Sequence, residues 1–170
     1  MPVIIRGSSG GNAITDSTYT PGMVVQVQSY QTGALASGST TTPIDDTIPQ
    51  NTEGVEFMTV SITPRFSTSK LFITSVATFS GPTNGTYNYA LFRDSIADAL
   101  ATNVTNEATA TGMMSIALQY YMNSPGTSAT TFKIRLGCNQ AGTVYLKGYT
   151  GGRLSGGVVN SSITVMEIAQ

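Results

Sequence analysis

The chain has 170 residues and a formal net charge of −1, and only 10% of its residues are charged. It contains no histidine and a single cysteine, which excludes an internal disulfide, histidine-dependent nucleophilic catalysis and Cys-rich zinc sites. Because the sequence has no cluster of lysine and arginine and no long apolar run, we expect neither a nucleic-acid partner nor membrane insertion.

Residues 1–22 differ in composition from the rest and are predicted to form an extended N-terminal arm. The short apolar segment Val3, Ile4 and Ile5 precedes a Gly/Ser run at residues 7–11, a composition typical of flexible linkers. These residues form either a disordered terminus or an arm whose apolar segment adds to the sheet edge of another chain and anchors the protein in a particle.

From residue 23 to residue 170 the sequence shows short runs of alternating apolar and polar residues, separated by Gly, Pro, Ser and Asn. Its 18 serines and 26 threonines are typical of sheets with one hydrated face. These features predict one all-β domain, an antiparallel jelly-roll-like β-sandwich of about eight strands. The residues predicted to share a face, strand by strand, are Met23, Val25 and Val27; Met58, Val60 and Ile62; Leu71, Ile73, Ser75, Ala77 and Phe79; Tyr87, Tyr89 and Leu91; Met114, Ile116, Leu118, Tyr120 and Met122; Phe132, Ile134, Leu136 and Cys138; Val144 and Leu146; and Ile163 and Val165. On such a face Cys138 is expected to be a small buried hydrophobe.

Two connections have distinctive sequences. Asn84-Gly85 is the strongest hairpin signal of the chain, because both residues tolerate a positive φ. Residues 94–101 allow either one helical turn, with Asp94 or Ser95 as N-cap, or a strand–turn–strand corner. The lack of a sustained apolar stripe favours the corner.

Four of the nine acidic residues form the one acidic cluster of the sequence, Asp45, Asp46, Glu53 and Glu56. Their spacing matches neither an EF-hand loop nor a recognisable glycosidase pair. The four carboxylates could hold Ca²⁺ together with backbone carbonyls, and this alternative stays open. We expect instead that Asp45 and Asp46 accept hydrogen bonds from backbone amides, and we predict no catalytic residue, no metal site and no cofactor.

The remaining charged residues have simple structural interpretations. Arg93 and Asp94 are expected to form an ion pair or a side-chain-to-backbone bond at a turn. Lys133 and Arg135 alternate with large apolar residues, so we expect them on a hydrated strand face or paired with carboxylates of a neighbouring subunit. By the same alternation, Lys147 is predicted to face away from its apolar neighbours.

A candidate contact site for a glycan or receptor comprises Tyr145, Tyr149 and Arg153. Both tyrosines are predicted to face away from the apolar side of their strand, beside the Gly-rich loop at residues 151–157 that carries Arg153. A tyrosine can stack on a sugar ring while an arginine bonds to its hydroxyl groups. The alternative is ordinary packing between subunits beside a flexible loop.

The order of several segments resembles a bacteriophage virion-surface module, similar to C-terminal domains of tail-fibre and capsid-decoration proteins. The segments that carry this resemblance are Pro43–Gly54, Ile62–Pro64, Ser67–Leu71, Ala90–Asp94, Ser124–Thr127, Thr131–Arg135, Gly142–Tyr145 and Ser162–Ile168. The resemblance implies a jelly-roll-like sandwich, a homotrimer, a location on the virion and other virion proteins as partners. It transfers no catalytic residue.

The expected function is therefore that of a non-enzymatic virion component, a trimeric short-fibre or tail-tip protein that contacts host glycans. Capsid decoration, in which a small trimer stabilises the shell, is the alternative within this class. Outside it, the alternatives are a free-standing glycan-binding module and a carbohydrate-cleaving enzyme with two catalytic carboxylates.

Overall fold

The computed structural model describes residues 19–107 and 112–170, and within these ranges β-strands dominate. The described residues contain no α-helix; their one helical element is a short 3-10 helix, η2 (Ser155–Gly157). No helix in these ranges could cross a membrane. The predicted anchoring residues Val3, Ile4 and Ile5 lie outside the described part of the chain.

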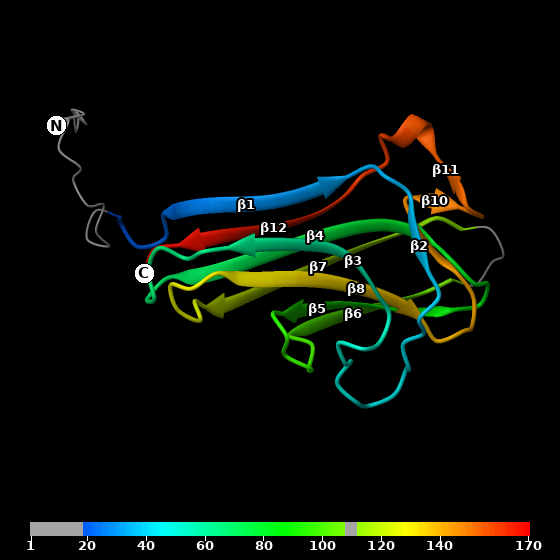
Figure 1. Cartoon of the computed structure of the whole chain (residues 1–170), viewed down its shortest axis with the longest axis horizontal. Helices are drawn as coiled ribbons and strands as arrows, with labels where there is room; N and C mark the ends of the chain where they lie inside the picture. The colour runs from blue at the N-terminus through cyan, green and yellow to red at the C-terminus, as the bar shows by residue number, and fades with distance from the viewer. Residues whose placement is uncertain (1–18, 108–111) are drawn as a thin grey trace.

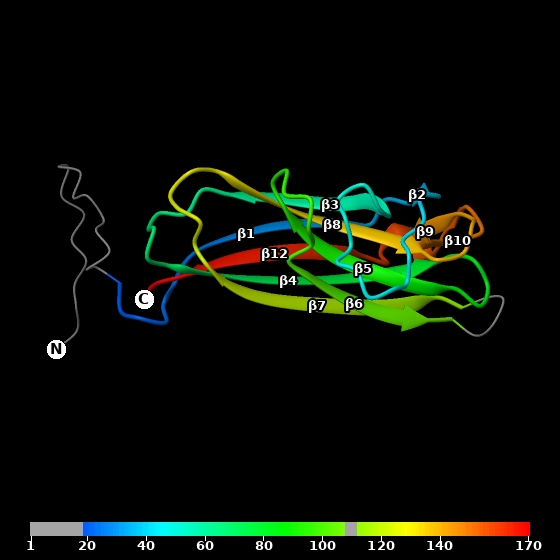
Figure 2. The ribbon, with the colours of Figure 1, turned by 90° about the horizontal axis from the view of Figure 1, so that it is seen from below.

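The strands form a sandwich of two antiparallel sheets, which confirms the predicted fold class (Figures 1 and 2). The first sheet has the order β1-β12-β4-β9-β2, and β7 also pairs with β4. Its strands are β1 (Val24–Thr32), β2 (Ala36–Gly38), β4 (Lys70–Ser80), β7 (Met114–Asn123), β9 (Val144–Leu146) and β12 (Ser161–Ile168). The second sheet has the order β3-β8-β5-β6. Its strands are β3 (Val55–Ile62), β5 (Thr86–Arg93), β6 (Ala101–Asn106) and β8 (Thr130–Cys138). A separate short ribbon consists of β10 (Gly148–Tyr149) and β11 (Gly152–Arg153).

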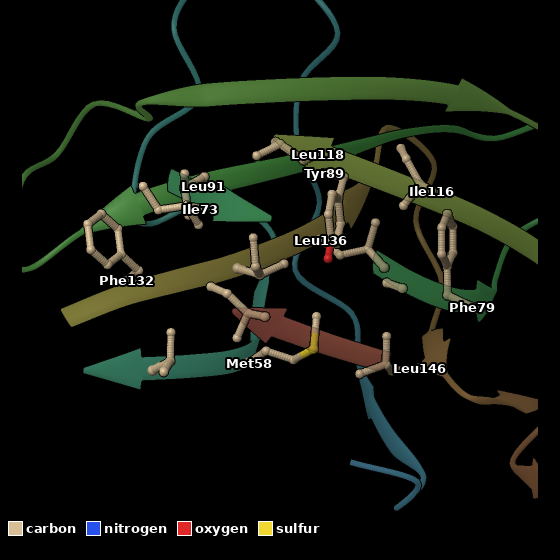
Figure 3. Close-up of a cluster of buried hydrophobic side chains, with 14 of the residues drawn as sticks. Met58, Ile73, Phe79, Tyr89, Leu91, Ile116, Leu118, Phe132, Leu136 and Leu146 are labelled. Carbon is tan, nitrogen blue, oxygen red and sulfur yellow. The ribbon is translucent and has the colours of Figure 1, made fainter. Parts of the chain in front are cut away.

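One hydrophobic core fills the space between the two sheets (Figure 3). Strand β4 shows why: Leu71 and Ile73 point inward and are fully buried, whereas Val76 points outward and is 41% exposed. This is the two-residue periodicity that the sequence predicts. Each large apolar side chain removed from water in this way contributes roughly 1.5–3 kcal/mol. The buried set includes Cys138, as predicted.

The buried hydroxyl groups of Ser75 and Tyr89 form hydrogen bonds within the core. The hydroxyl groups of Ser75 and Tyr89 lie 2.6 Å apart, and the Ser75 hydroxyl also donates to the carbonyl of Ser162 at 2.7 Å. Burial raises the pKa of the Tyr89 hydroxyl above its ordinary value. The hydroxyl groups of Ser75 and Tyr89 are therefore satisfied within the core. Elsewhere among the described residues, Glu107 Oε2 and Arg93 Nε are buried without a hydrogen-bond partner.

The Asn84-Gly85 turn does not close the hairpin that the sequence predicts. Asn84 adopts a positive φ of 54°, but Gly85 does not. The strands that flank the turn belong to different sheets, since β4 pairs with β12, β9 and β7, whereas β5 pairs with β6 and β8. The turn therefore carries the chain from one layer of the sandwich to the other.

The corner at residues 94–100 is confirmed as a strand–turn–strand connection between β5 and β6. The prediction for Lys147 is wrong, because its side chain is only 1% exposed. A φ of 62° at Lys147 breaks the alternation of β9, and the ammonium group donates to the Thr32 hydroxyl at 3.3 Å. Burial lowers the pKa of this lysine.

Candidate interaction surfaces

The outer face of the first sheet consists of apolar and hydroxyl-bearing side chains. The register places Val27, Met166, Phe72 and Tyr121 in one transverse row across β1, β12, β4 and β7. The next row along the strands consists of Ser29, Thr164, Thr74 and Gln119. Among the described strands of this sheet, Lys70 is the one charged residue that faces outward, and its ammonium lies 5.7 Å from the centre of the Tyr121 ring. Within residues 19–107 and 112–170, the outer face of the first sheet thus carries no carboxylate.

The outer face of the second sheet is charged and partly covered by two loops. Residues 39–54 connect β2 to β3, and residues 94–100 connect β5 to β6 (Figure 1). The backbone amide of Asn51 donates to the carbonyl of Ala97 at 2.8 Å, and the backbone amide of Ala99 donates to the carbonyl of Pro49 at 3.0 Å. Together the two loops cover Phe92, which points outward from β5 yet is 1% exposed.

A cleft of about 290 Å³ lies beside this covered area and is named the capped cleft. Its lining residues are Asn51, Glu56, Phe92, Asp94, Ser95, Lys133 and Arg135.

Ion pairs within the chain organise the charges of the capped cleft. One carboxylate oxygen of Glu56 lies 3.6 Å from the Lys133 ammonium and 3.7 Å from the Arg135 guanidinium. Arg135 also donates to the carbonyls of Glu53 and Gly54, both at 2.8 Å. Lys133 and Arg135 therefore have a carboxylate partner within their own chain. The sequence predicts for them a hydrated strand face or carboxylates of a neighbouring subunit.

The predicted contact between Arg93 and Asp94 is confirmed. The Arg93 Nε lies 3.8 Å from one Asp94 oxygen, and the other oxygen accepts the Thr131 amide at 2.8 Å. The turn that carries Asp94 into the capped cleft is thus tied to β8, where Thr131 lies.

The acidic segment forms local hydrogen bonds, as predicted for Asp45. Its carboxylate accepts the hydroxyl of Thr47 at 2.6 Å and the amide of Thr47 at 2.9 Å, and these bonds lower the pKa of Asp45. Glu53 accepts the amide of Gln50 at 3.0 Å. Within the described ranges, no group of three or more potential ligands is arranged to hold a metal ion.

The sequence-predicted contact residues Tyr145, Tyr149 and Arg153 lie on β9, β10 and β11, at the end of the sandwich opposite the C-terminus (Figure 1). Tyr149 pairs with Gly152, and Arg153 pairs with Gly148. Neighbouring residues of a strand point to opposite sides, so the register places Tyr149 and Arg153 on opposite faces of the ribbon.

Two further contacts place Arg153 and Tyr145. A Cβ atom built on Gly157 would lie 2.9 Å from the Arg153 guanidinium, and one built on Gly151, in the turn between β10 and β11, would lie 3.9 Å from the Tyr145 ring. The binding of a glycan or receptor by Tyr145, Tyr149 and Arg153 stays a prediction. The capped cleft was not recognised from the sequence, although the alternating Lys133 and Arg135 on β8 were a visible signal of a charged strand face.

Comparisons with known proteins relate the fold to others. No protein-family model and no curated protein matches the chain. It is similar to the solved structure of Eiger TNF from S. frugiperda, with a TM-score of 0.50 and 10% identity over 89% of this chain and 95% of that one. A structure described as "CBM4 structure and function" has a TM-score of 0.37 and 11% identity over 67% of this chain and 76% of that one. The solved structure of infectious bursal disease virus, Gx strain, has a TM-score of 0.37 and 12% identity over 86% of this chain and 37% of that one. The first of these supports the jelly-roll-like architecture of the chain.

Proposed function

We propose that this chain is a non-catalytic structural protein of a bacteriophage virion, which acts at the particle surface as a homotrimer. The observation that carries the proposal is the outer face of the first sheet, with its apolar row and no carboxylate. We favour a short-fibre or tail-tip role with contact to host glycans over capsid decoration, and other virion proteins are the expected docking partners. The segment order that resembles phage surface modules supports this assignment.

Burial of this face against another copy is favourable for a simple reason. Val27, Val76 and Tyr121 are 49%, 41% and 51% exposed in the single chain. Their burial would contribute about 25 cal/mol for each Å² of apolar surface removed from water. Among the described strands of the first sheet, Lys70 is the one charged residue on this face, and no carboxylate lies there. Little of that gain is therefore lost to the desolvation of ions.

The distribution of charge gives the assembly an orientation. The exposed carboxylates Glu56 and Asp94 belong to the second sheet and its loops, not to the first sheet. In the proposed trimer the first sheet faces the other copies and the second sheet faces solvent. A particle component built in this way presents its polar loops outward.

Sedimentation of the purified chain tests the assembly. We expect the wild-type protein to sediment as a trimer and Val27→Glu to shift it toward the monomer, because each copy would then bury an unpaired carboxylate. Val104→Glu is the matched control, since Val104 is 51% exposed on the second sheet and should leave the trimer intact. Circular dichroism verifies that both variants fold. A wild-type monomer would contradict the proposal, and sugar binding by that monomer would favour a free-standing glycan-binding module.

Labelling of intact phage particles with an antibody against the chain tests its location. Label at the tail tip or fibres is expected. Label over the whole capsid would replace the fibre assignment with capsid decoration, and particles free of the protein would overturn the virion assignment.

A further inference from the structure

We infer that the capped cleft binds a single hexose-type sugar residue, the terminal unit of a glycan. This deepens the proposed function, because it names the surface and the ligand class for glycan contact. The inference rests on the proposed function in one respect: the second sheet must face outward in the assembly.

The size of the cleft restricts its ligand. Its volume of about 290 Å³ lies just below the range of small-molecule sites, roughly 300–1,000 Å³. The buried residue Phe92 is part of its lining. The cleft therefore fits one small ligand and not an extended chain.

The polar groups of the cleft match a polyol. Lys133 offers an ammonium donor, Glu56 and Asp94 offer carboxylate acceptors, and Asn51 and Ser95 offer groups of both kinds. A sugar hydroxyl both donates and accepts, so neighbouring hydroxyls on one ring can bond to a carboxylate and to an ammonium at the same time.

The charges of the cleft favour an uncharged ligand. The cleft is lined by two cations, Lys133 and Arg135, and by two carboxylates, Glu56 and Asp94, so its lining has no net formal charge. Glu56 pairs with both of these cations and Asp94 pairs with Arg93, so each charge already has a partner within the chain. Moreover, the separations of 3.6 and 3.7 Å around Glu56 exceed hydrogen-bond length, so the Glu56 carboxylate and the Lys133 ammonium retain capacity for ligand hydroxyls.

The walls of the cleft are held in place by bonds that do not involve a ligand. Asn51 donates its side-chain amide to the carbonyls of Ser95 and Ile96, at 3.3 and 3.2 Å. Arg135 is fixed by the carbonyls of Glu53 and Gly54. A preformed site of this kind loses little conformational entropy on binding.

Binding of methyl glycosides to the full chain tests the inference, because these compounds mimic a terminal sugar. The probes are the methyl glycosides of glucose, galactose, mannose and N-acetylglucosamine, titrated into isotope-labelled protein and followed by NMR. We expect binding with a Kd on the order of millimolar. The shifts should concentrate at Asn51, Ser95 and Lys133.

Two nearly isosteric variants identify the binding groups. Lys133→Met and Glu56→Gln should each weaken binding about tenfold or more. Arg65→Met is the control, because it removes an exposed cation from the loop between β3 and β4, away from the residues that line the cleft. Thermal unfolding tests whether each variant is folded. If a variant does not fold, the chemical-shift changes of the wild-type protein still identify the residues that bind the sugar.

Three results would overturn the inference: no binding of any of the four probes, shifts confined to residues 145–157, or unchanged affinity in both folded variants. Sedimentation of the same samples reports separately on the trimer. Failure of sugar binding is therefore distinguishable from failure of the proposed virion role.

Discussion

At the scale of single residues, Glu167 on β12 shows how one buried carboxylate organises several segments. Its side chain is fully buried and accepts hydrogen bonds from the amides of Arg65 and Phe66, the hydroxyl of Ser69 and the side-chain amide of Gln26. Burial alone would raise the pKa of Glu167, but these bonds outweigh it and hold the pKa below its ordinary value of 4.5. Glu167 thus ties the loop between β3 and β4, and the edge strand β1, to the centre of the first sheet.

Replacement of Glu167 by Gln tests this role. The substitution places an amide donor among donors, and we expect it to lower the free energy of unfolding at pH 7 by about 2–3 kcal/mol. Since the folded-state pKa lies below the unfolded one, the contribution of the carboxylate is complete above pH 4.5 and disappears as the pH falls through the folded-state value. Urea unfolding between pH 7 and pH 3 measures both effects. A wild-type-to-variant difference that stays constant down to pH 3 would contradict the role.

At the scale of elements, the Asn84-Gly85 turn shows that a turn signal does not determine which strands pair. The sequence identifies a turn there, and the positive φ of Asn84 agrees. The glycine is required for a different reason, because a Cβ atom at Gly85 would overlap the sulfur of Cys138 on β8 and would lie 2.9 Å from the carbonyl oxygen of Pro82. The turn is therefore shaped by contact with the second sheet.

A double-mutant cycle distinguishes the two contacts that a side chain at Gly85 would make, with the sulfur of Cys138 and with the carbonyl oxygen of Pro82. Gly85→Ala should destabilise the fold by about 1–3 kcal/mol through overpacking against Cys138. Cys138→Ala in the same background should recover part of that loss, whereas independent effects would simply add. The measurement is chemical unfolding of the two single variants and the double variant. Strict additivity would show that the carbonyl oxygen of Pro82, not the sulfur of Cys138, excludes a side chain at Gly85.

At the scale of the whole molecule, the sandwich has one face suited to protein contact and one suited to solvent. Hydrogen bonds join the two layers along both sides: Gln26 donates to the carbonyl of Thr63 beside β1, and Asn103 donates to the carbonyl of Ala117 between β6 and β7. The broad faces are left as the main surfaces for partners. The first presents an apolar row with no carboxylate, and the second presents the capped cleft.

Association through the first sheet has a thermodynamic consequence for the wild-type protein. Binding between folded copies stabilises the folded state by mass action, so Tm should rise with protein concentration. We expect this dependence over a hundredfold range in differential scanning calorimetry, and we expect it to be lost in Val27→Glu. A concentration-independent Tm for a wild-type protein that sediments as a monomer would argue against the proposed assembly.

Much of the local structure followed from alternation and composition. The buried residues of β4, β7, β8 and β12 were predicted because side chains alternate across a strand, and this local rule needs no knowledge of the partner strand. The same reasoning placed Cys138 in the core, whereas the contact between Arg93 and Asp94 was predicted from their place at a turn. The reasoning from alternation failed at Lys147, where a positive φ interrupts the alternation.

The pairing of strands and the assembly of surfaces depended on contacts between residues distant in the chain. Glu56, Asp94 and Lys133 lie on three different segments, and only the pairing of β8 with β3 and β5 brings them to one cleft. The short β10–β11 ribbon likewise directs Tyr149 and Arg153 to opposite sides. Composition and periodicity predict which strand residues face the core, because side chains alternate across a strand. Phe92 and Lys147 are buried outside this rule. Which exposed groups meet was decided by the tertiary fold, because strand register is a long-range property.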